Sequence, residues 1–84
     1  MREITKDEEE RVRFAVFAIE AAAAKSGIPA WELYARLERL DLVRRRLFED
    51  YPMLHTQGRD YIADDLLETL ANWEAAARQK GGGA

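Results

Sequence analysis

The stretch FAVFAIEAAAAKSG, residues 14–27, decides the fold, because it has the pattern of a helix that is apolar around much of its circumference. Such a helix normally lies inside a protein and is contacted from more than one side. Four consecutive alanines, residues 21–24, would let a neighbouring helix approach closely. Apolar residues at three- and four-residue spacing predict the core face, namely Val12, Val16, Ile19 and Ala23, with Ala15, Ala18 and Ala22 beside it and Phe14 and Phe17 widening it.

Both ends of this helix carry recognisable signals. Thr5 can act as N-cap, and Glu8 three residues later would complete a capping box. Gly27 follows Lys25 and Ser26, in the position of a glycine that ends a helix in the left-handed conformation. We therefore predict a helix that begins after Thr5 and ends before Gly27.

Three further helices follow along the chain. Pro29 marks the start of the second helix, whose inner stripe is Leu33 and Leu37. Asp41 would cap a short third helix with Val43 and Leu47 inward, and Pro52 predicts a turn at Tyr51. The last helix spans residues 56–80, with an inner stripe of Ile62, Leu66, Leu70 and Trp73.

These patterns predict an all-α fold, a bundle of two longer and two shorter helices. No segment alternates polar and apolar residues over the length of a strand. With 84 residues the chain is expected to form one domain, residues 1–79, followed by a disordered tail, residues 80–84. Burial in so short a chain is limited, so contact with a partner would add stability.

Composition restricts the chemistry that the chain can carry. There is no Cys and a single His, so disulfides and the usual zinc ligands are lacking and we expect no cofactor. The acidic start lacks the pattern of a secretory signal, and residues 14–24 are too short and too polar to cross a bilayer. We therefore expect a cytoplasmic protein with no membrane contact.

Charge is unevenly distributed along the chain, although the formal net charge is only -3. Residues 36–46 hold five arginines against two acids, whereas residues 49–74 hold seven acids against one arginine. This contrast predicts an electrically polarised molecule that could self-associate head to tail or antiparallel. Trp31 and Trp73 are large for so small a core, and either one at the surface would serve as an anchor for a partner.

The segment LHTQG, residues 54–58, interrupts the amphipathic helix pattern with polar residues and a glycine. In a structural interpretation, Thr56 caps the last helix, Gly58 permits close approach of another backbone, and His55 is hydrogen-bonded and half buried. In a functional interpretation, His55, Thr56, Gln57 and Arg59 surround a helix N-terminus and bind a phosphate or the carboxylate of a partner. The acids Asp60, Asp64 and Asp65 weaken the second interpretation.

The chain also resembles a family of small bacterial helical domains described only as a domain of unknown function. The resemblance covers residues 4–72 and is most specific in LHTQGRDYIADDL, which resembles the pattern L-H-T-x-G-x-x-Y-I-x-x-D-I; the matching residues are Leu54, His55, Thr56, Gly58, Tyr61, Ile62 and Asp65, with Leu66 in place of Ile. The segment DLVRRRLFED is longer and more basic than that family's pattern. Some members are encoded beside ADP-ribosyltransferase-like toxin candidates, so the resemblance implies a partner-binding or antitoxin-like role and no catalytic residues.

The sequence bears on two other classes of function, catalysis and DNA binding. Catalysis would need a base with a positioned partner and a concave pocket, and neither is indicated, so we expect no enzyme. A DNA-binding regulator of the helix-turn-helix type could use Arg44, Arg45 and Arg46 as a basic recognition segment. Consecutive arginines fan around a helix, however, and the chain is acidic overall, so these arginines could instead pair with Glu49, Asp50 and the acidic last helix.

We therefore interpret the chain as a non-enzymatic helical module that binds another protein, for instance a toxin-like neighbour, or a second copy of itself. The sequence favours a protein partner over nucleic acid, without excluding the latter. The predicted contact residues are His55, Thr56, Gln57, Gly58, Arg59 and Tyr61, helped by Arg44, Arg45 and Arg46.

Overall fold

Helices account for most of the described part of the chain, residues 5–82, in the computed structural model. They are α1 (Lys6–Ser26), α2 (Ala30–Arg39), the π-helix η1 (Val43–Phe48), α3 (Tyr51–Leu54) and α4 (Arg59–Gly82). These residues contain no strand, which confirms the predicted all-α class. The predicted third helix corresponds to η1, and α3 lies where the sequence predicted a turn, so three short elements accompany the two long helices.

The ends of α1 follow the sequence signals. The Thr5 side chain accepts a hydrogen bond from the Glu8 backbone N–H at 3.1 Å. At the other end Gly27 has φ +78°, and its N–H donates to the Ala23 carbonyl at 2.9 Å. Because side chains with a Cβ are strained at this positive φ, glycine suits the position.

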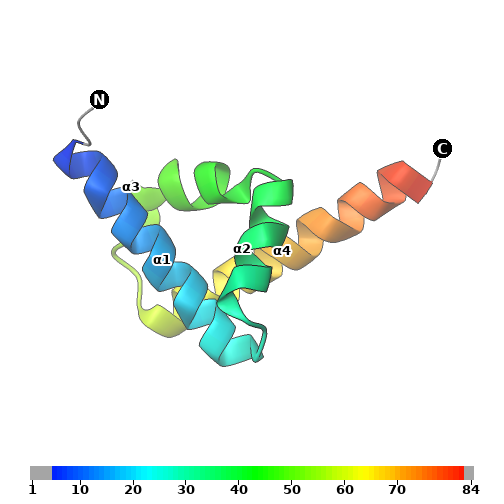
Figure 1. Ribbon diagram of the computed structural model, residues 1–84, viewed down its shortest axis with the longest axis horizontal. Coiled ribbons are helices and arrows are strands. Elements are labelled where there is room, and N and C mark those ends of the chain that lie inside the picture. Colours follow the sequence, from blue (N-terminus) through cyan, green and yellow to red (C-terminus); the bar gives the residue numbers. More distant parts are fainter. Residues whose placement is uncertain (1–4, 83–84) are drawn as a thin grey trace.

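The long helix α1 occupies the central position that its composition predicts. It contacts α4, η1 and α2, and in Figure 1 the chain wraps so that α1 and α2 lie in front of the first half of α4. The second half of α4 projects beyond the other helices and ends far from the N-terminus. Only the first half of α4 is therefore available to form the core with α1.

The core face of α1 is only partly the predicted one: Ile19 is buried as expected, as are the alanines predicted beside it, but the two valines are not. Val12 and Val16 are about half exposed, and Phe17 is also exposed. The buried residues instead include four alanines, and are Phe14, Ala15, Ala18, Ile19, Ala21 and Ala22. Small side chains on both partners let two helix backbones come close, and α4 contributes the buried Ala63. We attribute the exposure of Val12 and Val16 to this packing, because β-branched side chains on the contact face would hold the two helices further apart.

Leucines fill the remainder of the core. Seven of them are almost completely buried: Leu33, Leu37, Leu42, Leu47, Leu54, Leu66 and Leu70. The predicted stripes of α2 and α4 are confirmed by Leu33 and Leu37, and by Ile62, Leu66 and Leu70. Trp73 was predicted to continue the α4 stripe, and it is instead exposed.

The segment after α2 makes a sharp reversal at Asp41, which has a left-handed φ of 59°. Asp tolerates this conformation better than most residues. The prediction that the Asp41 side chain caps the next helix is wrong, because its carboxylate accepts hydrogen bonds from the Arg44 guanidinium instead. In η1 the Glu49 N–H donates to the Arg44 carbonyl, five residues earlier. Leu42 and Leu47, also five apart, are therefore the buried pair, while Val43 is only partly buried.

The chain turns at residues 49–50, before the predicted position at Tyr51. Pro52 lies in the first turn of α3, where the missing N–H of proline costs no helical hydrogen bond. The last helix begins at Arg59, three residues later than predicted, and continues to Gly82. Residues 80–82, which the sequence assigned to a disordered tail, thus belong to α4, and residues 83–84 of that tail lie outside the described residues.

Candidate functional site

The predicted contact segment, residues 55–61, joins α3 to α4. The Thr56 hydroxyl donates to the Met53 carbonyl at 2.9 Å, so Thr56 closes the end of α3 and the prediction that it caps α4 is wrong. The Gly58 carbonyl accepts the hydrogen bond of the Ile62 N–H at the start of α4. A Cβ built at Gly58 meets nothing within 4 Å, so the predicted close approach of another backbone is also wrong.

His55 belongs to a small aromatic cluster at the end of α3. Its Nδ1 lies 2.6 Å from the Tyr51 carbonyl oxygen, and its ring stacks on the Tyr51 ring at 4.4 Å between centroids. Tyr51 in turn forms a T-shaped pair with Phe14, with 5.4 Å between ring centroids, and the Arg11 guanidinium lies 5.2 Å from the centre of the Tyr51 ring. His55 is hydrogen-bonded as predicted, but it is exposed where half burial was expected. Tyr51 therefore connects α3 to α1, and His55 has a local structural role in which it packs on Tyr51 at the end of α3.

The other predicted contact residues do not converge on His55. Gln57, Arg59 and Tyr61 are exposed. Within residues 5–82, no hydrogen bond, ion pair or ring contact joins the segment 55–61 to Arg44, Arg45 or Arg46. The structure therefore does not assemble the predicted residues into a single site.

The three consecutive arginines of η1 are engaged with acids. Arg44 pairs with Asp41 and Glu49 at 2.5 and 2.7 Å, which confirms one of the expected pairings. Arg46 pairs at 2.7 Å with both Asp50 and Asp65, which confirms the expected pairings with Asp50 and with the acidic last helix. Arg45 is held more loosely, with Asp41 at 3.6 Å and its guanidinium 5.9 Å from the centre of the Trp73 ring. A phosphate backbone would have to displace these carboxylates to bind here.

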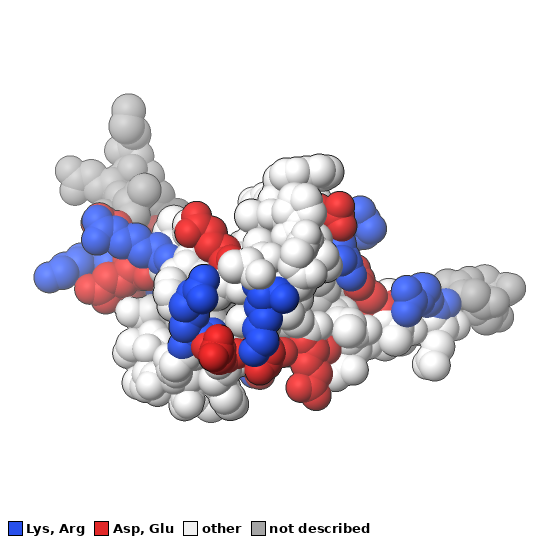
Figure 2. Space-filling model, turned by 90° about the horizontal axis from the view of Figure 1, so that it is seen from below, with Lys and Arg blue, Asp and Glu red and all other residues white. Residues whose placement is uncertain are grey.

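The two oppositely charged segments neutralise each other within the fold. Arg46 pairs with Asp65 and Arg36 with Glu74, so basic residues of the first segment meet acids of the second. Lys25 of α1 pairs with Asp64 at 2.7 Å. Figure 2 shows Lys and Arg side chains lying next to Asp and Glu side chains over the visible face, not a basic half facing an acidic half. The expectation of a strongly polarised molecule is therefore not met on this face.

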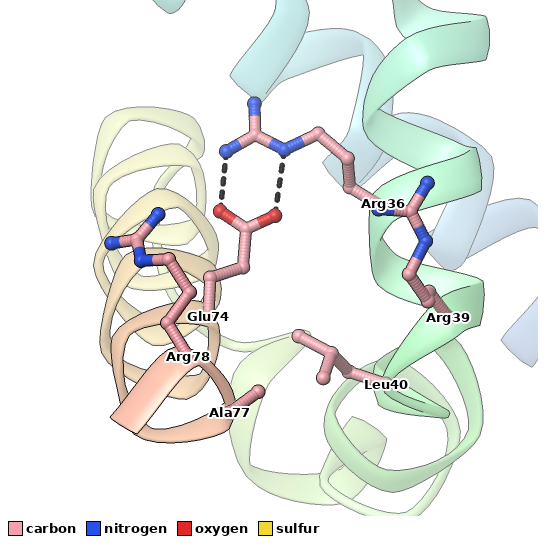
Figure 3. A pocket seen from close by; sticks show the side chains of 6 residues that line it. All are labelled: Arg36, Arg39, Leu40, Glu74, Ala77 and Arg78. Carbon is pink, nitrogen blue, oxygen red and sulfur yellow. Dashed lines mark hydrogen bonds and ion pairs between the residues drawn. The ribbon is translucent and has the colours of Figure 1, made fainter. Parts of the chain in front are cut away.

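A pocket that the sequence did not predict lies between α2 and the second half of α4 (Figure 3). Its volume is about 430 Å³, and its lining consists of Arg36, Arg39, Leu40, Glu74, Ala77 and Arg78. Arg36 donates two hydrogen bonds to Glu74, at 2.8 and 2.5 Å. Arg39 and Arg78 stand on opposite sides of this pair, above Leu40 and Ala77.

Electrostatics in this arginine pocket favour the ionised carboxylate. The hydrogen bonds from Arg36, aided by the positive charges of Arg78 and Arg39, lower the pKa of Glu74 below its usual value. The same hydrogen bond raises the pKa of Arg36. Three guanidinium groups thus surround one carboxylate, and the pocket suits the acidic group of a partner better than a basic one.

A second surface, the α1–α2 groove, is apolar and solvent-exposed. Its volume is about 300 Å³, and its lining consists of Val16, Ile19, Glu20, Ala30, Trp31 and Tyr34. Trp31 is 74% exposed and Val16 and Tyr34 are each 50% exposed. Trp31 therefore fulfils the condition set by the sequence for an anchor residue.

The sequence contained signals for both surfaces, but it did not show which helix faces would meet. Arg36 and Arg39 share one side of a helix, as do Glu74 and Arg78, yet only the crossing of α2 with α4 makes them a pocket. Val16 was predicted to be buried because its face of α1 is the more apolar one. The groove appears only once the alanine face is assigned to the core.

Other kinds of site receive no support from the described residues. No group of three His, Cys, Asp or Glu side chains among them is placed to hold a metal ion. None of their helices combines the length and apolarity needed to cross a membrane.

Comparisons with known proteins agree with the resemblance noted from the sequence only at the level of the family. No curated protein and no solved structure matches the chain significantly. A family model described as a protein of unknown function, DUF3791, matches residues 13–73, which include most of α1, all of α2, η1 and α3, and the first half of α4. The chain therefore belongs to the DUF3791 family.

Proposed function

We propose that the protein is a non-enzymatic helical module that binds another protein through the α1–α2 groove. One observation carries this proposal: Trp31 is 74% exposed and adjoins an apolar groove between two helices. Leaving a tryptophan and its apolar neighbours in water is unfavourable, and contact with a partner would remove them from water. Tryptophan is also among the residues that contribute most to binding energy at interfaces.

The contact surface proposed here differs from the one predicted from the sequence. His55 and Thr56 are used to close α3, and Arg44 and Arg46 hold acids of their own chain. Gln57, Arg59 and Tyr61 remain exposed, but none of them lines the groove. The groove, by contrast, offers apolar area that the fold itself does not use.

Site-specific photo-crosslinking in the organism of origin tests this proposal. Trp31 would be replaced by p-benzoylphenylalanine, which is also a large aromatic residue, and Glu68, exposed on α4, would be replaced in a control variant. We expect one companion to crosslink at position 31 and not at position 68. Equal labelling at both positions, or none at position 31, would contradict the proposal.

An antitoxin-like role in the cytoplasm is a narrower form of the same proposal. It is supported by the resemblance of residues 54–66 to a motif found in domains encoded beside toxin candidates, and by a composition without Cys. The crosslinked companion would then be a toxin-like protein. Identification of the companion by mass spectrometry decides this point.

The alternative function, a DNA-binding regulator, stays a prediction from the Arg44–Arg46 segment. Gel-shift measurements at low salt test it, because phosphate contacts make affinity fall steeply with salt. A complete absence of binding at low salt would remove this alternative.

A further inference from the structure

The outer face of α1 has a charge pattern that is complementary to itself. This face consists of Arg13, Val16, Phe17 and Glu20. Arg13 and Glu20 are seven residues apart, and each lies three and four residues from the central pair, so all four share one side of the helix. All four are exposed. Val16 and Phe17 form the middle of this face, with Arg13 three residues before the pair and Glu20 three residues after it.

This symmetry selects one arrangement of two copies. If two α1 helices pack antiparallel with Val16 and Phe17 at the crossing, Arg13 of each copy lies opposite Glu20 of the other. A parallel arrangement would instead bring Arg13 against Arg13 and Glu20 against Glu20. Antiparallel packing also produces a closed two-fold dimer, in which one patch is used twice.

The α1–α2 groove independently favours a basic side chain as its occupant. Glu20 is the only charged residue in its lining, beside the two aromatic rings of Trp31 and Tyr34. An arginine matches these features, since its aliphatic stem can cover apolar surface while its guanidinium meets a carboxylate or an aromatic face. The antiparallel arrangement places Arg13 of the second copy at the Glu20 edge of the groove.

Arg13 is able to make this second contact. It pairs at 2.5 Å with Glu9, one turn earlier on its own helix, and its side chain is 77% exposed. A guanidinium has five N–H donors, so Arg13 can keep Glu9 and also reach a carboxylate of another chain.

We propose that the second copy of this chain is the occupant of the α1–α2 groove, in an antiparallel dimer held by reciprocal Arg13–Glu20 ion pairs around Val16 and Phe17. This inference rests on the proposed function, because it names the partner of the same surface. It differs from the self-association expected from the charged segments of the sequence, since those segments neutralise each other within one chain.

Charge reversal with analytical ultracentrifugation tests the dimer. The wild-type chain alone is expected to sediment with twice the 9.7-kDa monomer mass. Arg13→Glu and Glu20→Arg should each raise the dimer dissociation constant by at least about tenfold, because each places like charges opposite each other at two symmetric positions. The double variant R13E/E20R should recover the wild-type dissociation constant.

Mixing the two single variants gives the most specific result. An R13E chain carries two acids on this face and an E20R chain carries two arginines, so both contacts become favourable only between unlike chains. We expect each variant to be monomeric alone and the mixture to form a heterodimer, with unchanged helical circular dichroism. Recovery in the mixture also excludes unfolding of either variant as the cause of the loss.

The outcomes separate this inference from the proposed function. A monomeric wild-type chain at millimolar concentration, or a dimer that both single variants leave unchanged, would overturn the proposed dimer. If a different protein then crosslinked at position 31, the interaction module would stand with another partner. If the dimer formed but nothing crosslinked at position 31, the groove would not be the contact surface, and both proposals would fail.

Discussion

The Arg46 guanidinium of η1 donates two hydrogen bonds to the Asp65 carboxylate of α4, at 2.9 and 2.7 Å, and a third to Asp50 at 2.7 Å. Only 24% of the Arg46 side chain and 19% of the Asp65 side chain are exposed. The hydrogen bond to Asp65 is the main reason that the pKa of Arg46 is raised. This two-bond geometry, sheltered from solvent, distinguishes the pair from the exposed pairs elsewhere on η1.

Replacing Arg46 should therefore destabilise the fold more than replacing its neighbour Arg44. We expect Arg46→Met to lower the free energy of unfolding by about 1–2 kcal/mol, because it leaves a partly buried Asp65 without its donor. Arg44→Met should cost less than about 0.5 kcal/mol, since Arg44 and its two partners are each about half exposed. Urea denaturation followed by circular dichroism measures both. Equal losses for the two variants would show that Arg46 does not hold η1 on α4.

The Arg36–Glu74 pair predicts how stability depends on pH. The pKa of Glu74 is lower in the folded chain than its usual value, chiefly because of hydrogen bonds from Arg36. A carboxylate whose pKa is lowered by folding stabilises the folded chain at pH values above its pKa in the unfolded chain. This stabilisation is lost as the pH falls through the pKa of the folded chain. We therefore expect the urea midpoint of Glu74→Gln to fall less than that of the wild type between about pH 5 and pH 2.

Arg36→Met provides the matched control for this pH effect. Because Arg36 is the main cause of the lowered pKa, its removal should flatten most of the acid dependence that Glu74→Gln removes, with the remainder due to Arg78 and Arg39, and the double variant should add little to Glu74→Gln. Asp41, whose pKa is lowered by Arg44, retains part of the acid dependence in every variant. An acid dependence that matched the wild type in both single variants would rule out the pair as its source.

The sequence predicted helix existence better than helix orientation. Thr5, Gly27 and the leucine stripe of α2 act through local geometry, so they could be identified without the fold. The choice between the two apolar faces of α1 depends on how closely α4 approaches, and nothing local to residues 12–23 determines that distance. Val16 and Ala18 were therefore assigned by hydrophobicity, and the closer contact available to alanine reversed the assignment for Val16.

The absence of information about contacts between distant helices also explains why the sequence did not predict the groove or the arginine pocket. The motif around His55 was unusual in composition, and the sequence suggested two uses for it without deciding between them. Its contacts with Tyr51 and Met53 lie within four residues, so they could have been anticipated as a local structure that ends α3. The groove and the arginine pocket each require two helices to meet, and such contacts between distant residues are not encoded in a local pattern.

Leu33 and Trp31 lie two positions apart on α2, but truncation to alanine should affect the free energy of unfolding strongly at Leu33 and hardly at all at Trp31. Leu33 is 1% exposed, so Leu33→Ala should cost about 2–5 kcal/mol through lost burial and a cavity. Trp31 is 74% exposed, so Trp31→Ala should change the free energy of unfolding by less than about 0.5 kcal/mol in the monomer. Urea denaturation at a protein concentration below the dimer dissociation constant measures the free energy of unfolding of both variants. A large loss for Trp31→Ala under these conditions would mean that Trp31 belongs to the core.

The glycines that flank α1 and α4 differ in backbone conformation, and the same substitution should separate them. Gly58 has no positive φ, and its surroundings leave room for a Cβ. A serine there would precede α4, where its hydroxyl can accept a hydrogen bond from an amide of the first turn, and it would also restrict the unfolded chain. We expect Gly58→Ser to raise the free energy of unfolding by about 0.5 kcal/mol.

Gly27→Ser is the matched control for that substitution. Gly27 has φ +78°, a conformation that costs a residue with a Cβ about 1 kcal/mol or more, although space is open around it as well. The two variants introduce the same side chain into equally open surroundings, so a difference in sign between them isolates the backbone. A destabilised Gly58→Ser variant would contradict the open surroundings and ordinary backbone conformation of position 58.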